Sequence, residues 1–256
     1  MEDLFIIPED PNAKIWRYMD FTKYVSMLIK SSLFFVRSDK FDDKFEGAPT
    51  KKDIDSRNEI QDISQTSEVD RKILPIYNQS QKKSIGICSW HLSEYESAAM
   101  WKLYLQSNEG VVIQSTFKKL DDSCKSFSEL QIHTGLVKYT DYETEQIFQP
   151  SIFSRFMNKR KNFDHEKEVR SIFFIQPKYD IDREISEYSE EEIDILCETI
   201  TGNGKYIKVN INDLIEKVVV SPYSKDWYFE LVEEITKKLG FKLPLSYSTL
   251  SENPCF

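Results

Sequence analysis

Two acidic side chains and one basic side chain share a stretch of the sequence where charged residues give way to apolar ones. The stretch, residues 161–175, reads KNFDHEKEVRSIFFI and changes character near Glu168, which predicts a loop that enters a strand. Alternate side chains of a strand share a face, so we expect Glu166, Glu168 and Arg170 to point the same way. Charged groups at the mouth of a buried strand either pair with one another for structure or line a cleft. All three are therefore candidate catalytic residues.

A second block, residues 84–116, combines a histidine with several aromatic rings. Residues 85–90 predict a strand, and His91 follows it directly, where a loop could present the imidazole to a cleft. His91 is therefore a further candidate catalytic residue. The helix expected after it brings Trp101 and Tyr104 within reach of each other. Such rings are core residues by default, but they also suit the stacking of a base or of nicotinamide.

A basic cluster precedes the two carboxylates. Residues 143–160 predict a segment that is helical in part and interrupted by Pro150. The segment ends in basic residues that usually form a solvated face, although their position just before the carboxylates also suits a phosphate. The cluster consists of Arg155, Lys159, Arg160 and Lys161.

Composition argues against several classes of protein. Seven glycines in 256 residues argue against a glycine-rich phosphate loop, and a net charge of −9 argues against general nucleic-acid affinity, which needs a basic surface. The three histidines lack metal-ligand spacing and no cysteine cluster joins them, so we expect no metal. Four scattered cysteines and no recognisable signal peptide favour a cytoplasmic location, and no apolar run is long enough to span a membrane.

The order of the predicted elements indicates the fold class. Strands and helices are mixed along the chain, without an internal repeat or a flexible linker. We expect one α+β domain over residues 1–256, with a central, mostly antiparallel sheet flanked by helices. Residues 50–83 are the most polar part of the chain and suit a helical insertion. Beyond residues 85–90, strands are expected at 15–18, 33–36, 111–113, 132–139, 168–175, 206–209 and 215–220, with the tail from residue 243 as an edge strand.

Several of these segments together resemble a large bacterial family without an established activity. The segments are WRY at 16–18, LFF at 33–35, FDDKFEG at 41–47, CSWH at 88–91, AMWKLY at 99–104, GVVI at 110–113 and HEKEVR at 165–170. The resemblance implies a stand-alone bacterial protein, and some members are linked to phage defence. Lys44 stands where such families usually have proline.

A second resemblance, to ADP-ribosyltransferases of the Arg–Ser–Glu type, suggests a reaction. Those enzymes carry an arginine on an early strand, a Ser-Thr-Ser strand and a later Glu-x-Glu. Arg17, Ser115 and the pair Glu166 and Glu168 occur in that order, and Phe117 replaces the final serine. The resemblance implies an ADP-ribosyltransferase-like fold and NAD as substrate. Arg17 would hold the pyrophosphate, Ser115 would order the glutamate, and Glu168 would stabilise an oxocarbenium-like transition state.

Three functions stay open at this point. The first is an NAD-consuming transferase or glycohydrolase, a defence effector or toxin that binds a small nucleotide and modifies a protein or nucleic acid. The second is a nuclease in which Asp42, Asp43, Glu166 and Glu168 hold a divalent metal. The third is a non-catalytic nucleotide-sensing or partner-binding protein. The overall acidity counts against the second, and the aromatic residues favour the first. Candidate substrate-binding residues are Arg17, Tyr18, Asp43, Glu46, Trp90, Trp101, Tyr104 and Ser115.

Overall fold

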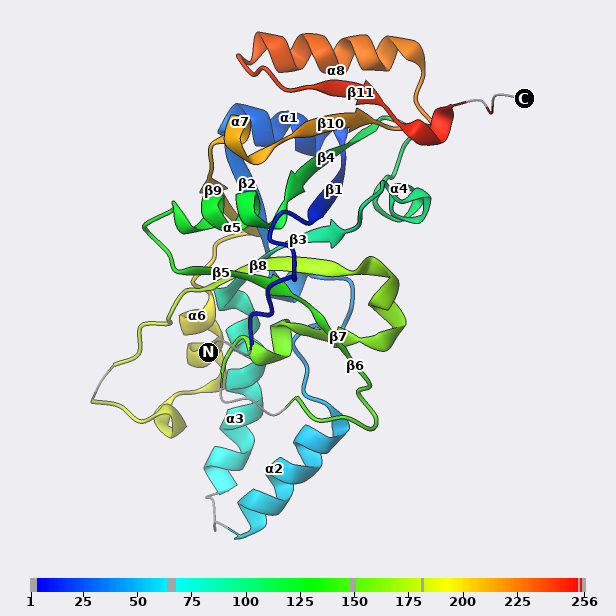
Figure 1. Ribbon diagram of the computed structural model, residues 1–256. Coiled ribbons are helices and arrows are strands. Elements are labelled where there is room, and N and C mark those ends of the chain that lie inside the picture. The colour runs from blue at the N-terminus through cyan, green and yellow to red at the C-terminus, as the bar shows by residue number, and fades with distance from the viewer. Residues whose placement is uncertain (1–3, 64–67, 148–150, 181, 253, 255–256) are drawn as a thin grey trace.

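Nine strands form one branched, mostly antiparallel sheet in the residues that the computed structural model describes, 4–63, 68–147, 151–180, 182–252 and 254 (Figure 1). They are β1 (Lys14–Asp20), β2 (Ser32–Arg37), β3 (Ile85–Leu92), β4 (Gly110–Thr116), β5 (Ile132–Leu136), β8 (Glu168–Phe174), β9 (Gly204–Lys208), β10 (Lys217–Val220) and β11 (Leu245–Tyr247). The order is β11-β10-β4-β1-β3-β2-β9, with β8 joined to β3 and β5 joined to β8. Within this sheet only the β10–β11 pair is parallel. A separate parallel pair consists of β6 (Lys138–Thr140) and β7 (Asn158–Arg160).

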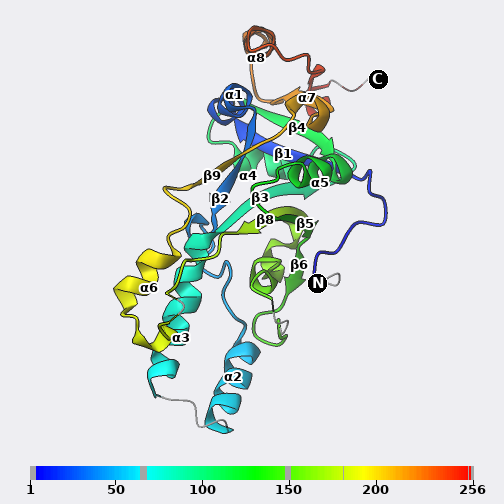
Figure 2. The same ribbon diagram turned by 90° about the vertical axis from the view of Figure 1, so that its left-hand side faces the viewer.

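Helices flank this sheet, which confirms the predicted α+β class. They are α1 (Phe21–Lys30), α2 (Lys51–Ile63), α3 (Glu68–Ser80), α4 (Ala98–Tyr104), α5 (Phe117–Lys125), α6 (Glu190–Cys197), α7 (Ile211–Leu214) and α8 (Asp226–Lys238). Short 3₁₀ turns are η1 (Ser38–Lys40), η2 (Gln81–Ser84), η3 (Ser154–Phe156), η4 (Lys161–Glu166), η5 (Ile185–Glu187) and η6 (Thr249–Ser251). In both views α2 and α3 extend from the lower end of the molecule, and α8 lies at the opposite end (Figures 1 and 2). In the described part of the chain, no helix combines the length and the apolar character that crossing a membrane requires.

β8 is buried on both faces, as its apolar run predicts. Val169 and Phe173 pack in the largest hydrophobic cluster, whereas Ile172 packs with Ile85 and Ile87 in a second cluster. Removing one such side chain from water contributes about 1.5–3 kcal/mol. These clusters fix the register of β8, because a slip of one residue would exchange its two faces. The polar start of the strand is therefore held firmly in place.

Residues 143–160, predicted to be helical in part, are helical over one short 3₁₀ turn among their described residues. In the described residues of that range, 143–147 and 151–160, the chain forms η3 and β7 but no α-helix; Pro150 lies outside the described residues. The side chain of Asn158 accepts a hydrogen bond from Thr140 Oγ1 at 2.7 Å and donates to the backbone oxygen of Ser154 at 2.7 Å. Tertiary pairing with β6 therefore outweighs the local helical preference.

Candidate functional site

A cleft opens in the sheet where β1 and β2 separate along one edge of β3. Among the described strands, β1 pairs with that edge at His91 and Leu92, and β2 pairs with it at Gly86 and Ile87. Residues 88–90 between them pair only with β8, on the other edge. The cleft has a volume of about 840 Å³, which lies in the usual range for small-molecule sites.

Arg17 of β1 spans this opening. Its Nη2 donates to the backbone oxygen of Phe34 on β2 at 3.1 Å, and its Nη1 contacts Sγ of Cys88 on β3. The guanidinium carbon lies 5.9 Å from the centroid of the Trp90 ring. Arg17 and Trp90 both line the cleft. A guanidinium in this place is suited to an anionic group such as a phosphate.

Five charged side chains form a continuous array at the floor of the cleft; we call Glu46, Arg170, Glu168, Lys159 and Glu166 the charged array. Arg170 Nη1 donates to Glu46 Oε1 at 2.7 Å, and Arg170 Nε donates to Glu168 Oε2 at 2.7 Å. Lys159 Nζ donates to Glu168 Oε1 at 2.6 Å and to Glu166 Oε2 at 2.7 Å. All five are buried. Lys159, Glu166 and Glu168 line the cleft, and Arg170 and Glu46 lie beneath its surface.

The two carboxylates beside Lys159 differ in how readily they ionise. Burial alone would raise the pKa of Glu168, but the positive charges of Arg170 and Lys159 outweigh it and hold this pKa below its ordinary value. Burial raises the pKa of Glu166, and its hydrogen bond with Glu168 and the negative charge there raise it further. Glu168 is therefore a carboxylate at neutral pH, and Glu166 is the carboxylate that takes up a proton more readily.

Two tyrosines contact the carboxylate region from different elements. Tyr104, the last residue of α4, donates from its hydroxyl to Glu166 Oε2 at 3.2 Å. The backbone N–H of Glu168 donates to the hydroxyl of Tyr139 on β6 at 2.8 Å. Burial raises the pKa of Tyr104, and the charge of Glu166 adds to the effect. Tyr104 therefore stays a neutral donor.

His91 lies directly opposite Glu168 on the neighbouring strand and lines the cleft. Its Nδ1 is 2.6 Å from the backbone oxygen of Glu166, and because a carbonyl only accepts, Nδ1 carries the proton. Burial lowers the pKa of His91. The neutral ring therefore offers a lone pair at Nε2.

The structure places two predicted substrate-binding residues, Trp101 and Ser115, outside both the cleft lining and the charged array. Trp101 is fully buried, its Nε1 donates to Glu96 Oε2 at 2.9 Å, and its ring packs edge-on against Tyr18. Ser115 is fully buried on β4 and donates to the backbone oxygen of Leu214 at 2.6 Å. Ser115 faces α7 because side chains alternate along β4, and the sequence does not show which face of a strand meets the cleft.

The remaining predicted substrate-binding residues, apart from Glu46, reach the cleft wall. Tyr18 lines the cleft, and its hydroxyl accepts a hydrogen bond from the backbone of Ser97 at 2.6 Å. Asp43 also lines the cleft and accepts from Arg160 Nη2 at 2.7 Å. Trp90 and Tyr104 complete this set. The structure thus brings most of the predicted residues together, and their roles stay predictions.

Two cleft residues are missing from the predicted site set. Lys159 stands in a basic cluster typical of a solvated face, yet β7 turns it inward, 4.6 Å from the centroid of the Phe163 ring. A strand of three residues is too short to show an alternating pattern. Ser89 also lines the cleft, and its Oγ is buried without a hydrogen-bond partner. A ligand could supply that partner.

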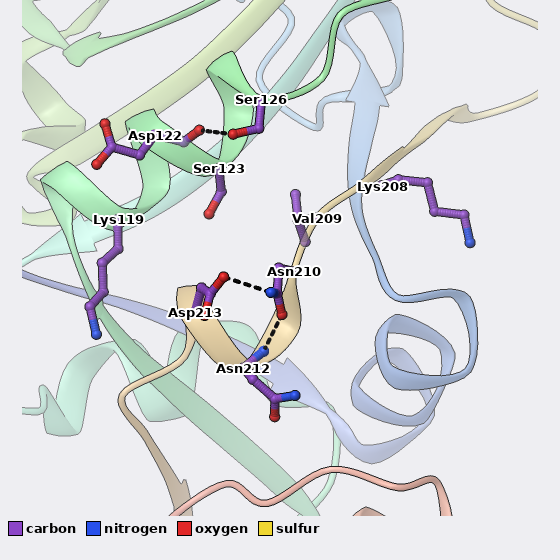
Figure 3. A pocket seen from close by; sticks show the side chains of 9 residues that line it. All are labelled: Lys119, Asp122, Ser123, Ser126, Lys208, Val209, Asn210, Asn212 and Asp213. Atoms are coloured by element: carbon purple, nitrogen blue, oxygen red, sulfur yellow. Dashed lines mark hydrogen bonds between the residues drawn. The ribbon is translucent and has the colours of Figure 1, made fainter.

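A second cavity, of about 610 Å³, lies between α5 and the segment that leads into α7 (Figure 3). Asn210 Nδ2 donates to Asp213 Oδ2 at 2.6 Å, and Asn210 Oδ1 accepts from the backbone of Asn212 at 3.2 Å. The cavity shares no lining residue with the cleft. We assign no site to it. Its lining residues are Lys119, Asp122, Ser123, Ser126, Lys208, Val209, Asn210, Asn212 and Asp213.

Three of the four carboxylates of the metal-dependent interpretation are engaged by cationic side chains, and the fourth, Asp42, is exposed at the cleft. Asp43 is paired with Arg160, and Glu166 and Glu168 are paired with cations of the charged array. Within the described residues, no group of three or more His, Cys, Asp or Glu side chains is arranged to hold a metal ion. Asp43, Glu166 and Glu168 therefore act as ion-pair partners of neighbouring cations in this structure.

Comparisons with known proteins place the carboxylates within a matched segment. The sequence profile of a family described as protein of unknown function (DUF2971) matches residues 100–171, which include Tyr104, Lys159, Glu166, Glu168 and Arg170. The search of curated proteins found no match.

Among solved structures, this chain is similar to DarT of Thermus sp. 2.9. For DarT in complex with NAD⁺, the identity is 9%, the match covers 96% of this chain and 99% of that chain, and the TM-score is 0.43. For DarT in complex with ADP-ribosylated single-stranded DNA, the values are 9%, 97%, 99% and 0.42. For DarT in complex with carba-NAD⁺, they are 10%, 94%, 96% and 0.38. The likeness is distant, and the ADP-ribosyltransferase-like refinement of the fold stays a prediction.

Proposed function

We propose that the cleft binds NAD⁺ and that this chain cleaves the bond between nicotinamide and ribose, transferring ADP-ribose to an acceptor or to water. The observation that carries the proposal is the charge of the array at the cleft floor. It contains three carboxylates, Glu46, Glu166 and Glu168, and two cations, Lys159 and Arg170. A cation bound beside Glu166 would favour loss of its proton despite its raised pKa, and the array would then hold one negative charge more than its own cations balance. The nicotinamide ring of NAD⁺ is a cation and would balance that charge.

The same array favours the reaction as well as binding. When the bond between ribose C1′ and the ring nitrogen breaks, its electron pair leaves with nicotinamide, which becomes neutral, and positive charge develops on the ribose. Glu168 is 4% exposed and ionised, so its field acts through a dry medium where electrostatic stabilisation is strong. The acceptor then forms a bond to C1′ and releases a proton. Glu166, whose pKa is raised, and Nε2 of His91 both line the cleft and are the candidate bases for this proton.

The other end of the substrate would lie toward β2. Arg17 offers its guanidinium to the pyrophosphate. Phe34 and Tyr206 form an aromatic wall of the same cleft, with ring centroids 4.8 Å apart, and such rings suit a base. The bacterial family that the sequence resembles adds a biological role to the proposal, that of a defence effector or toxin.

The experiment compares ligand binding and product release. Isothermal titration calorimetry with NAD⁺ and NADH should show tighter binding of NAD⁺, because NADH has a neutral nicotinamide. Chromatography should detect nicotinamide released from NAD⁺. Glu168→Gln keeps the shape but removes the charge, and it should lower turnover about a hundredfold with little change in folding. Glu143→Gln, an exposed glutamate paired with Lys51, is the matched control.

Four outcomes bear on the proposal. Full activity of Glu168→Gln would remove this residue from the reaction. Binding of NAD⁺ without nicotinamide release would favour a nucleotide-sensing protein. If the wild type neither binds nor cleaves NAD⁺, the proposal fails. Relief of growth inhibition by Glu168→Gln on expression would support the toxin role.

A further inference from the structure

Glu96 lies in the connection between β3 and α4, and both of its carboxylate oxygens are occupied. Oε2 accepts from Trp101 Nε1 at 2.9 Å and from Ser248 Oγ at 2.6 Å. Oε1 accepts from Thr249 through its backbone N–H and its hydroxyl, each at 2.7 Å. Burial alone would raise the pKa of Glu96, but these donors outweigh it and lower the pKa. Four donors on one carboxylate form a strong, directional link.

This link joins parts of the chain that are about 150 positions apart. Ser248 precedes the C-terminal turn η6, and Thr249 is its first residue. Helix α4 follows the cleft strand β3, and both η6 and α4 lie at the right of Figure 1. Helices as short as α4, which has seven residues, are marginal alone. Its position therefore depends on its anchors. Besides Glu96, the anchors are the buried Trp101 and Ser97, whose N–H donates to Tyr18.

The end of α4 reaches the charged array. Tyr104 is three residues after Trp101, so the two side chains lie on neighbouring turns of one short helix. The Tyr104 hydroxyl donates to Glu166 Oε2 at 3.2 Å. A shift of Trp101 would therefore change the distance between this hydroxyl and Glu166.

We propose that Glu96 is a positioning residue: it clamps α4 to the C-terminal turn and thereby holds Tyr104 against Glu166. The clamp is a property of the structure, and its effect on turnover rests on the proposed function. Glu96 does not line the cleft, so it acts through α4.

Glu96→Gln tests the clamp, because an amide nitrogen cannot accept the hydrogen bonds that one of the oxygens receives. We expect amide hydrogen exchange over residues 98–104 to become about tenfold faster. We expect kcat for nicotinamide release to fall about tenfold with KM for NAD⁺ nearly unchanged, since misplacement of a site group lowers the rate more than binding. Glu94→Gln is the matched control, because Glu94 is exposed in the same connection and pairs with Lys14.

A second pair of variants acts from the other side of the clamp. Thr249→Val removes one donor and keeps the backbone N–H, so it should cause a smaller change in the same direction. Thr249→Ser retains the hydroxyl, so its hydrogen exchange and turnover should match those of the wild type. The effects of Glu96→Gln and Thr249→Val should be less than additive when combined, because they remove the same link.

A readout independent of activity separates the clamp from the proposed function. Carbon-13 NMR of labelled glutamate carboxylates follows the titration of Glu166, and loss of the Tyr104 donor should raise its pKa further. If the wild type releases no nicotinamide, the proposed function fails, but the exchange and NMR results still decide the clamp. Unchanged exchange over 98–104 in Glu96→Gln would overturn it. Faster exchange with unchanged Glu166 titration would also overturn it, because α4 would then move without affecting the site.

Discussion

Arg170 is a buried cation that two carboxylates of the charged array share. It is fully buried on β8, bridges Glu46 and Glu168, and also donates to the backbone oxygen of Phe156 at 2.5 Å. The charges of Glu168 and Glu46 raise the pKa of Arg170 even though burial alone would lower it. Its guanidinium is therefore a permanent positive charge beneath the cleft floor. The sequence left two interpretations open, structural pairing and a cleft lining, and the structure shows both. Arg170 and Glu46 pair beneath the surface, whereas Glu166 and Glu168 line the cleft.

Arg170→Ala should destabilise the protein strongly. The change leaves two buried carboxylates without their shared cation, and breaking a buried pair in this way costs about 3–5 kcal/mol. Urea unfolding followed by circular dichroism measures the change. Arg183→Ala is the control, because Arg183 pairs with Glu192 at the surface, where such pairs contribute at most about 1 kcal/mol. A loss from Arg170→Ala no larger than that from the control would contradict this account of the array.

At the scale of elements, the connection between η1 and α2 is shaped by one glycine. Gly47 has a φ of +66°, and a Cβ there would meet the ring of Phe156. This close approach brings the preceding residue, Glu46, to Arg170 at 2.7 Å. The acidic segment FDDKFEG at 41–47 therefore places one of its carboxylates, that of Glu46, in the interior.

Gly47→Ala should destabilise the protein more than the same change at Gly202. Both glycines have a φ of +66°, but nothing lies within 4 Å of a Cβ at Gly202. Gly202→Ala therefore measures the backbone effect, roughly 1–2 kcal/mol, and Gly47→Ala adds overpacking against Phe156, typically about 1–3 kcal/mol more. Thermal unfolding of the two variants provides the comparison. Equal losses would show that the loop moves away from Phe156 at little cost.

At the scale of the whole molecule, the cleft exists because the sheet branches. One edge of β3 pairs with β1 at one end and with β2 at the other. The cleft opens along the middle of that edge, where residues 88–90 pair with neither strand. β8 closes the opposite edge of β3 along its full length and carries Glu168 and Arg170 there. Residues from β1, β2, β3, α4, β7 and β8 thus meet at one place, and the stability of the site is tied to that of the whole sheet.

The pH dependence of stability should report two histidines whose pKa is lowered, His91, which is buried, and His133, which is half-buried. Burial lowers the pKa of both His91 and His133, so the unfolded chain, with histidine pKa values near about 6.5, binds protons that the folded state resists. Stability is present above that value and is lost as the pH falls below it. The raised pKa of Glu166 acts in the opposite direction, so the comparison must use variants. Urea unfolding from pH 7 to pH 5 should show a smaller loss for His91→Gln and His133→Gln than for the wild type.

The control for this pH series is His165→Gln, because His165 is exposed. Its stability should follow the wild type across the range. If neither His91→Gln nor His133→Gln changes the dependence of stability on pH, other groups dominate the titration.

The sequence by itself determined the features that depend on local pattern. The alternation that begins at Glu168 predicted which side chains of β8 share a face, and the structure places Ile172 in one apolar cluster and Phe173 in another. The mixed order of strands and helices predicted the α+β class. Such patterns are readable because burial selects side chains at the period of the element itself.

Only the tertiary structure decided which faces and which distant segments meet. It placed Ser115 against α7 and Trp101 beneath Tyr18 rather than in the cleft lining, because the exposed face of a strand depends on what packs on it. It turned Lys159 from an apparent surface cluster to a position between two glutamates. It also joined Glu96 to residues 248–249. These contacts follow from the packing of elements far apart in the chain, which leaves no local periodicity in the sequence.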